Sequence, residues 1–443
     1  MHTYRVGLAA LAISCSACFG GDWRHWRGPA YNGSSDEKHL PASWSKTENV
    51  TWVRPLPGPS AATPIISGGR VFISSMAGTK HGLLGICVDR RDGKVLWQKS
   101  LGTGRWVPDN NMASCSPVTD GKKVFFLYGT GDLAGLDFGG KVIWSRSLEK
   151  DYGRFGIKYA YSASPLLHAG KLYVAVLRRD MDYRMPSGKK VRLDSFLLAL
   201  DPDTGKTIWK HARTTDAISE SQDSYSSPIP CQIGGRDGIL VSGADYMTCH
   251  DARTGKEIWR YRYVSRKHWL YRLVPSPLVT GGLVCGVVPR GKSVFGLDPL
   301  KKDKSGRAAL AWKLDKGPDI CTPLYYKGLL YVLDGQRKEL ACLDLAAEKL
   351  LWRKTLGGRT TFRASPTGAD DKIYCINMRG EVTVLAAGRK LKELARFSMG
   401  ERNLMASIAA ADGALFIRSP KKLYCIEKKE GLRPLGREGP AAR

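Results

Sequence analysis

Four arginines stand at comparable loop positions in the second half of the chain. They belong to the segments VPRGKS, DGQRKE, NMRGE and IRSPKK, and they are Arg290, Arg337, Arg379 and Arg418. A planar guanidinium group donates paired hydrogen bonds that match a carboxylate or a sulfate. If equivalent loops bring these side chains together, the sequence predicts a ring of positive charge that binds an anionic group.

Aromatic and polar residues are concentrated in a second set of loops, among them GTGRWVPDNNMAS, DYGRFGIKYAYSAS, SRKHWLYRLVPS and GGRTTFRAS. Flat aromatic faces suit sugar rings, and arginines beside them suit acidic groups. The further candidate ligand-binding residues are Arg105, Trp106, Tyr159, Tyr161, Tyr225, His268, Trp269, Tyr271 and Arg363. A structural interpretation stays open, in which the rings pack the loops and the arginines pair with local acids.

Some of these residue types also suit general acid–base catalysis. His268, Tyr271 or Tyr225 would act as acid and base on an acidic polysaccharide, while an arginine neutralises the uronate. Spacing along the chain does not place them within hydrogen-bond distance, so no catalytic residue is assigned. The eight histidines form no HxH or HExxH pattern. No CxxC spacing follows the N-terminal segment, so no metal site is predicted.

The scaffold that must position these loops is a repeated unit. Four strand–turn–strand copies read CVDRRDGKVLWQK, LALDPDTGKTIWK, CHDARTGKEIWRY and CLDLAAEKLLWRK. The Asp can accept hydrogen bonds from the turn, glycine where present allows a positive φ, and the Trp turns inward between neighbouring sheets. The residues assigned to this structural repeat are Asp89, Trp97, Trp144, Asp201, Gly205, Trp209, Asp251, Gly255, Trp259, Trp312, Asp344 and Trp352.

A second recurring pattern shows how many repeat units the chain contains. Small residues followed by proline open a strand at Pro64, Pro117, Pro165, Pro228, Pro277, Pro323 and Pro366, and a degenerate copy ends in Ile408. The signal recurs about every 49 residues, and each unit holds four short strands. The predicted fold is all-β, an eight-bladed β-propeller of four-stranded antiparallel blades. Because the last unit lacks its Trp strand, we expect an N-terminal strand around Trp52 to pair with the blade that contains Tyr424 and close the ring.

This strand order puts the links between blades on the same face as the loops that join each second and third strand. Both sets of candidate residues lie in those connections, and binding sites usually lie on loops of a rigid scaffold. The longest insertion runs from Arg178 to Phe196 in the third blade. It is predicted to be either a flap over that face or an extended hairpin.

The repeats resemble a known family. The LDxxTGKxxW copies are similar to the pyrroloquinoline-quinone-type propeller repeat, and DWRHWRGPAYNGSSDEKHLPASW resembles the N-terminal lead-in of bacterial proteins of this superfamily. The resemblance implies either a quinoprotein dehydrogenase or a non-enzymatic propeller similar to the lipoprotein of the outer-membrane β-barrel assembly machinery. In the first branch a vicinal Cys–Cys disulfide and a calcium site hold the quinone. This sequence has no adjacent Cys pair and no matching acidic trio, so no pyrroloquinoline quinone, metal or other cofactor is predicted.

Composition and the N-terminus indicate an exported, basic protein. The 443 residues carry a formal net charge of +28, which favours anionic partners. Residues 1–20 are predicted to be a signal peptide, with lipidation at Cys15 or Cys18 as an alternative, and no other segment is long enough to cross a membrane. The remaining parts are a lead-in (21–50), the propeller (51–430) and a disordered tail (431–443).

The favoured function is an exported, non-enzymatic binding or scaffold propeller of the cell envelope. We expect a periplasmic or secreted monomer whose partner is an anionic polysaccharide or protein, since an exported chain does not meet nucleic acid. The alternatives are a quinoprotein oxidoreductase and an enzyme that degrades acidic glycans. The cysteines occupy repeat positions that alanine also fills, so we expect most of them to be small buried residues.

Overall fold

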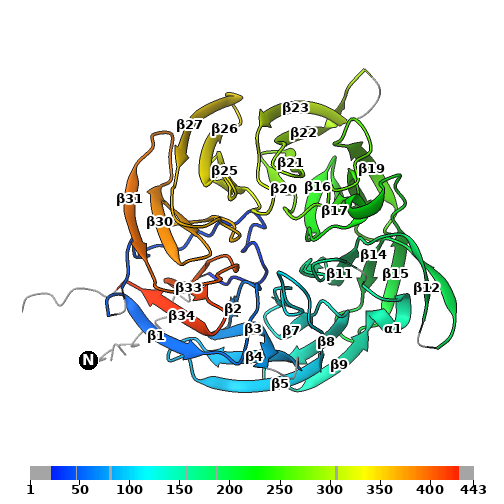
Figure 1. The fold of residues 1–443 in the computed structure, drawn as a ribbon, viewed down its shortest axis with the longest axis horizontal. Coiled ribbons are helices and arrows are strands. Elements are labelled where there is room, and N and C mark those ends of the chain that lie inside the picture. The colour runs from blue at the N-terminus through cyan, green and yellow to red at the C-terminus, as the bar shows by residue number, and fades with distance from the viewer. Residues whose placement is uncertain are drawn as a thin grey trace, which may run out of the picture.

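The computed structural model describes residues 21–45, 47–78, 82–155, 157–185, 187–304 and 308–428. Within them, eight four-stranded antiparallel sheets stand around a central axis (Figure 1). The predicted eight-bladed, all-β propeller is confirmed. The predicted signal peptide (1–20) and tail (431–443) lie outside the described residues.

Each blade runs outward from a short inner strand. Blades 1 and 2 contain β2 (Ile65–Ser67), β3 (Arg70–Ala77), β4 (Gly82–Asp89), β5 (Val95–Thr103), β6 (Val118–Thr119), β7 (Lys123–Leu127), β8 (Asp132–Asp137) and β9 (Val142–Ser147). Blades 3 and 4 contain β10 (Leu166–His168), β11 (Lys171–Val176), β14 (Phe196–Leu200), β15 (Thr207–Ala212), β16 (Ile229–Ile233), β17 (Arg236–Gly243), β18 (Tyr246–Asp251) and β19 (Glu257–Arg262).

The second half of the ring repeats this plan. Blades 5 and 6 contain β20 (Leu278–Thr280), β21 (Leu283–Val288), β22 (Ser293–Lys302), β23 (Ala308–Asp315), β24 (Leu324–Tyr326), β25 (Leu329–Asp334), β26 (Glu339–Asp344) and β27 (Lys349–Thr355). Blades 7 and 8 contain β28 (Thr367–Ala369), β29 (Lys372–Ile376), β30 (Glu381–Ala386), β31 (Glu393–Ser398), β32 (Ala409–Ala411), β33 (Ala414–Arg418) and β34 (Lys422–Glu427).

The ring closes as the sequence predicts. The N-terminal strand β1 (Val50–Pro55) pairs antiparallel with β34 and becomes the outer strand of blade 8. In that register Trp52 lies opposite Cys425 and Val53 lies opposite Tyr424. The first and last strands of the propeller therefore share one sheet, and the ring has no open junction between blades 8 and 1.

The tryptophan of an outer strand packs on the Asp–Gly turn of the next blade. A methyl group added to Gly205 would lie 2.5 Å from the ring of Trp144, and one added to Gly255 would lie 2.6 Å from Trp209. Both glycines have positive φ, so the turn requires glycine for its backbone as well as for this contact. In the third blade Asp201 accepts hydrogen bonds from the turn N–H groups through one carboxylate oxygen.

A chain of hydrogen bonds joins the innermost strands of the blades. The residue before each strand-opening proline, and before Ile408 in blade 8, carries a hydroxyl group. From blade 2 onward its oxygen accepts the backbone N–H of the equivalent residue in the preceding blade. Seven such bonds of 2.8–3.0 Å join Thr63, Ser116, Ser164, Ser227, Ser276, Thr322, Ser365 and Ser407 in that order. The hydroxyl of Thr63 is buried without a hydrogen-bond partner. We call this set the hydroxyl ring.

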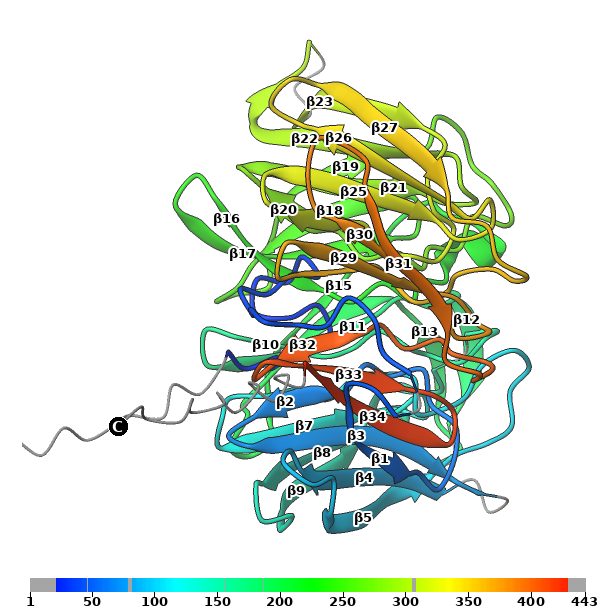
Figure 2. The same ribbon diagram turned by 90° about the vertical axis from the view of Figure 1, so that its left-hand side faces the viewer.

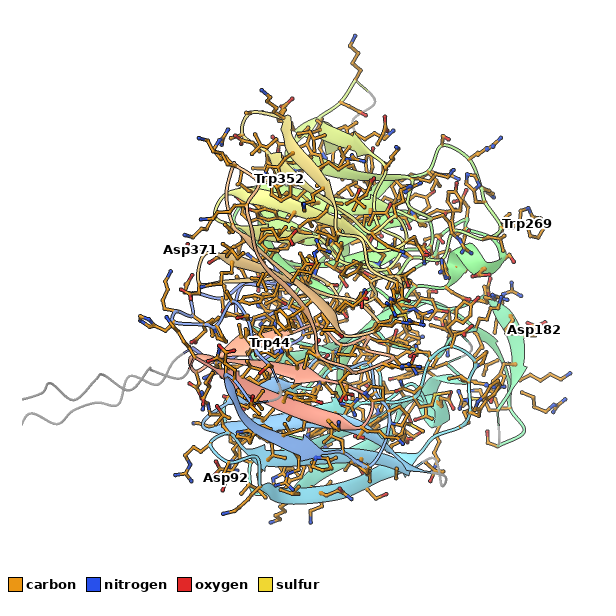
Figure 3. The ribbon with its side chains drawn as sticks, turned by 60° about the vertical axis from the view of Figure 1, so that its left-hand side comes forward. Trp44, Asp92, Asp182, Trp269, Trp352 and Asp371 are labelled. Carbon is orange, nitrogen blue, oxygen red and sulfur yellow. The ribbon has the colours of Figure 1, made fainter. Side chains whose placement is uncertain are left out.

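The propeller has two distinct faces, seen edge-on in Figure 2. The loop face carries the links between blades and the connections between second and third strands, whereas the turn face carries the first hairpin turns and the Asp–Gly turns. Figure 3 shows the two faces on opposite sides of the molecule. Trp269 and Asp182 of the loop face lie on one side, and Asp92 and Asp371 of the turn face lie on the other. The candidate ligand-binding residues all belong to the loop-face connections.

The lead-in closes the channel from the turn face. Trp23 exchanges two backbone hydrogen bonds of 2.9 Å with Ile66 of blade 1, and the carbonyl of Gly33 accepts the N–H of Gly368 in blade 7. Between these contacts Arg27 is 2 % exposed. Its guanidinium donates to the carbonyl oxygens of Asn32, Pro323 and Pro366 at 3.1–3.2 Å.

The insertion in blade 3 forms a hairpin. Strands β12 (Met181–Arg184) and β13 (Lys190–Leu193) pair only with each other and extend from the rim of the loop face (Figure 1). Two short helices also belong to this face, α1 (Leu148–Tyr152) and the 3-10 helix η2 (Ser219–Gln222). In the described ranges no helix is long and apolar enough to cross a membrane.

Candidate functional site

A cavity of about 370 Å³ lies at the loop-face end of the central channel. Loops from around the ring contribute to its wall, and Trp26 of the lead-in reaches it from the turn-face side. Four members of the hydroxyl ring line it as well, namely Ser164, Ser227, Ser365 and Ser407. The lead-in therefore converts an open channel into a closed-ended cavity that is reached from the loop face.

Tyr159 and Tyr225 form an aromatic part of the wall. Their ring centroids are 6.4 Å apart, and the Tyr225 hydroxyl accepts the backbone N–H of Tyr159 at 3.2 Å. The Asn110 amide donates to the carbonyl of Tyr159 at 2.7 Å and fixes the same loop from the other side. Burial, with the nearby Asp223, raises the pKa of Tyr225 well above its ordinary value, so its phenol is neutral at physiological pH.

Two arginines of the wall are paired with acids. Arg272 forms a two-pronged contact with Asp319, at 3.2 and 3.1 Å. Glu220 of η2 is 4 % exposed and lies 3.5 Å from Arg290 and 3.7 Å from Arg272. Because each guanidinium has a carboxylate beside it, this part of the wall is close to neutral in charge.

Arg363 differs from the other arginines of the wall. Its Nη1 donates to the backbone carbonyl of Asp109 at 3.2 Å and lies 3.9 Å from the sulfur of Met405. It forms no ion pair within the part of the chain that the structure describes. A guanidinium carries five N–H donors, so most of the hydrogen-bonding capacity of Arg363 is unused.

The predicted ring of four arginines does not form. Arg290 lines the cavity, but Arg337 pairs with Asp334 at 2.5 Å and Arg379 is exposed. Arg418 is 1 % exposed and donates to the carbonyls of Gly58 and Ser60 in the loop that enters blade 1. Equivalent loop positions thus lead to different partners, because each side chain finds whichever acceptors the neighbouring blade presents.

The other predicted residues are spread over the loop face. Tyr159, Tyr225 and Arg363 line the cavity, whereas Tyr161 is fully buried and donates to the carbonyl of Ala175. Arg105 pairs with Glu149 at 2.9 Å, and Trp106 and Trp269 are 73 % and 69 % exposed. His268 stacks on Tyr271, with ring centroids 3.7 Å apart, and neither belongs to the cavity wall.

Sequence reasoning missed several parts of the site. Arg272 belongs to the same segment as His268 and Tyr271, but its pairing with Asp319 joins two different inter-blade links. Trp26 reaches the cavity because the lead-in crosses the channel, which no local pattern indicates. The hydroxyl ring did carry a signal, since the residue before every counted proline is Ser or Thr.

The fold and the cavity define a propeller whose channel is capped on one face and open to loops on the other. The chain belongs to the outer membrane protein assembly factor BamB family, whose model matches residues 34–178 and 194–433. BamB from Moraxella catarrhalis has a similar structure, with a TM-score of 0.58 and 14% identity over 86% of this chain and 98% of that one.

Two curated relatives are enzymes. Tetrathionate hydrolase of Acidithiobacillus ferrooxidans is 22% identical over 386 residues, which cover 77% of this chain and 68% of that protein. The quinohemoprotein alcohol dehydrogenase ADH-IIG of Pseudomonas putida is 29% identical over 130 residues, only 28% of this chain and 15% of the dehydrogenase. The chain is therefore similar to two enzymes as well as to an assembly factor.

The residues of this cavity do not fit a calcium-held quinone. Such a site needs several carboxylates that are free to bind the ion. Here Asp319 and Glu220 are already engaged by arginines, which leaves Asp109 as the acid of the cavity wall that forms no ion pair among the described residues. Across the described ranges no group of three or more His, Cys, Asp or Glu side chains is placed to hold a metal ion. The nine cysteines of those ranges are buried and free.

Proposed function

We propose that this protein is a non-enzymatic binding propeller of the cell envelope, periplasmic or secreted, whose loop face binds an anionic partner. One observation carries the proposal. The cavity opens on a face where exposed cations have no ion pair in the described part of the chain: Arg266, Lys292, Lys316, Arg359, Arg379 and Arg402. A charged face of this kind raises the local concentration of anions and their rate of association.

Local electrostatics support a positive field there. Burial lowers the pKa of His268, and the nearby Arg266 and Lys292 lower it further because they disfavour a third positive charge. Trp106 and Trp269 add large exposed aromatic surfaces to the same face, and such side chains are enriched at binding interfaces. Membership of an outer membrane assembly factor family favours a protein partner, and the overall charge suits acidic polysaccharide equally well.

The enzymatic alternatives have less support. His268 and Tyr271 stack on each other outside the cavity, so they do not converge with Tyr225 on one substrate position. The hydroxyl of Tyr225 already accepts a hydrogen bond from the backbone of Tyr159. Turnover of tetrathionate by the purified protein would nonetheless replace the binding proposal with a hydrolase.

The test compares the two faces at equal change of charge. The loop-face variant carries Lys292→Gln, Arg379→Gln and Arg402→Gln, and the matched turn-face variant carries Lys206→Gln, Arg236→Gln and Arg253→Gln. All six residues are exposed and form no ion pair in the described ranges. Binding of polygalacturonate and of polyglutamate is measured at low and high salt, with dextran as the neutral probe.

We expect the loop-face variant to bind the acidic probes about tenfold or more weakly at low salt, since charge-assisted bonds are worth about 1.5–3 kcal/mol each when well formed. The turn-face variant should change little, and high salt should reduce the difference. Equal losses in both variants would mean that the basic charge acts diffusely, and the assignment to the loop face would be wrong.

A further inference from the structure

We infer that the loop-face cavity binds the end of an acidic glycan, one sugar ring with a single carboxylate, and that Arg363 holds this carboxylate. The inference rests on the proposed function and names the group that the cavity itself would take. It depends on the unpaired guanidinium, on the oxygen-rich wall and on the size of the cavity.

The guanidinium of Arg363 is the feature of the wall that favours a negatively charged ligand. Arg272 and Arg290 pair with Asp319 and Glu220, whereas Arg363 is the arginine of the wall that forms no ion pair among the described residues, although Asp109 also lines the cavity. Its hydrogen bond to the carbonyl of Asp109 involves a neutral acceptor. A carboxylate is the stronger acceptor for a guanidinium and can use two of its N–H groups at once, so exchange of the carbonyl for a carboxylate is favourable.

The rest of the wall matches hydroxyl groups. The oxygens of Ser164, Ser227, Ser365 and Ser407 accept backbone N–H groups of the hydroxyl ring, which leaves the O–H of each able to donate. All four line the cavity. A sugar ring presents hydroxyl oxygens in many directions and can accept such donors, whereas an apolar ligand would leave them without partners.

The aromatic side chains of the wall and the size of the cavity also suit a sugar ring. Tyr159, Tyr225 and Trp26 line the same space and offer flat apolar surfaces to the C–H face of a sugar. A volume of about 370 Å³ is near the lower end of the range for ligand cavities and has room for roughly one or two sugar rings. Trp26 and the lead-in close the far side, so a polymer can enter by its end but cannot pass through.

The direct experiment measures the binding of small ligands, because the diffuse charge of the loop face binds them only weakly. Glucuronate and glucose are titrated into the full-length protein by ligand-detected NMR and calorimetry. We expect saturable binding of glucuronate and binding at least about tenfold weaker for glucose, because glucose lacks the carboxylate. Acetyl-dialanine, which carries a peptide carboxylate, serves as the second acidic probe.

Arg363→Gln should weaken glucuronate binding at least about tenfold and leave the weak binding of glucose unchanged. Arg363→Lys keeps the charge but loses the paired geometry, so we expect an intermediate loss. Arg253→Gln removes an exposed cation of the turn face and is the matched control, with no expected change. Thermal unfolding of each variant checks that the fold is intact.

Three outcomes would overturn the inference: no saturable binding of glucuronate, equal binding to wild type and Arg363→Gln, or tighter binding of acetyl-dialanine than of glucuronate. The last would mean that the cavity takes a peptide terminus. None of these results depends on the polymer assay of the loop face, so the broader proposal can stand when this one fails. Equal loss of polymer binding in the loop-face and turn-face variants, with saturable glucuronate binding that Arg363→Gln weakens, would separate the two in the opposite direction.

Discussion

The two ends of the channel hold arginines with opposite environments. Arg27 at the turn-face end is fully buried and bonds to three backbone carbonyls, and Arg363 at the loop-face end is partly exposed and bonds to one. Neither has an acidic partner among the described residues. The difference shows that an arginine without an acid becomes structural when carbonyls use its donors, and remains available to a ligand when they do not.

Burial supports the structural role of Arg27. It lowers the pKa of this guanidinium to about 9, which is still above neutral pH, so the side chain remains charged inside the protein. A methyl group added to Gly33 would lie 1.8 Å from the guanidinium, which shows how closely the lead-in folds around it. The cation thus ties the lead-in to blades 6 and 7 through Pro323 and Pro366.

The largest expected effect comes from removal of Arg27. Arg27→Met keeps an apolar stem but leaves three carbonyls without their donor, and we expect the free energy of unfolding to fall by about 2–4 kcal/mol. Arg363→Met removes a single bond at a partly exposed position and should cost less than about 0.5 kcal/mol. Urea unfolding of both variants measures the difference, and equal losses would contradict the contrast between the two ends.

The fold was predictable because its signals are local. The Asp–Gly turns and the hydroxyl–proline strand openings each lie within a few residues, and they recur often enough to count eight blades. Partners of the candidate residues were not predictable in the same way. Arg418 donates to Gly58 and Ser60, which are far away in sequence and become neighbours only when the ring closes.

Local sequence signals also explain which residues of the cavity wall were predicted. Tyr159, Tyr225 and Arg363 were predicted because aromatic and basic residues mark the inter-blade links, which converge on the channel in any propeller. Whether an arginine there is free depends on the acids of adjacent links, as the pairing of Arg272 with Asp319 shows. Residue type therefore predicted the location, and only the structure separated paired from unpaired charges.

Asp245 extends the comparison to a buried acid without partners. It is fully buried in the loop between β17 and β18, and neither carboxylate oxygen has a hydrogen-bond partner. Burial raises its pKa from 3.8 to about 6, although Arg262 and Lys267 oppose the shift and Asp216 adds to it. The native state therefore holds the proton more tightly than the unfolded state, and stability falls as pH rises from about 4 to above 6.

Asp245→Asn should remove this pH dependence. Asparagine tolerates the positive φ at this position as aspartate does, and it carries no charge to bury. We expect the variant to be about 1–2 kcal/mol more stable than wild type at pH 8 and equal to it near pH 4, with the shift discounted because cations lie nearby. Thermal unfolding across this pH range is the measurement, and a constant difference at all pH values would refute the assignment to ionisation.

The smallest effect tests the hydroxyl ring, where satisfied and unsatisfied groups again stand side by side. Ser227 accepts the N–H of Ser164 at 2.8 Å, so Ser227→Ala leaves a buried amide without its acceptor and should cost about 1–2 kcal/mol.

Thr63 is the member of the hydroxyl ring whose hydroxyl is buried without a partner. Thr63→Val keeps its shape and removes only that hydroxyl, so stability should be unchanged or rise slightly, because an unpaired polar group is unfavourable in the interior. Denaturant unfolding of the two variants compares an internal junction with the closing one. A loss of stability for Thr63→Val as large as that for Ser227→Ala would mean that the Thr63 hydroxyl has a partner such as a bound water. The hydroxyl ring would then also be closed between blades 8 and 1.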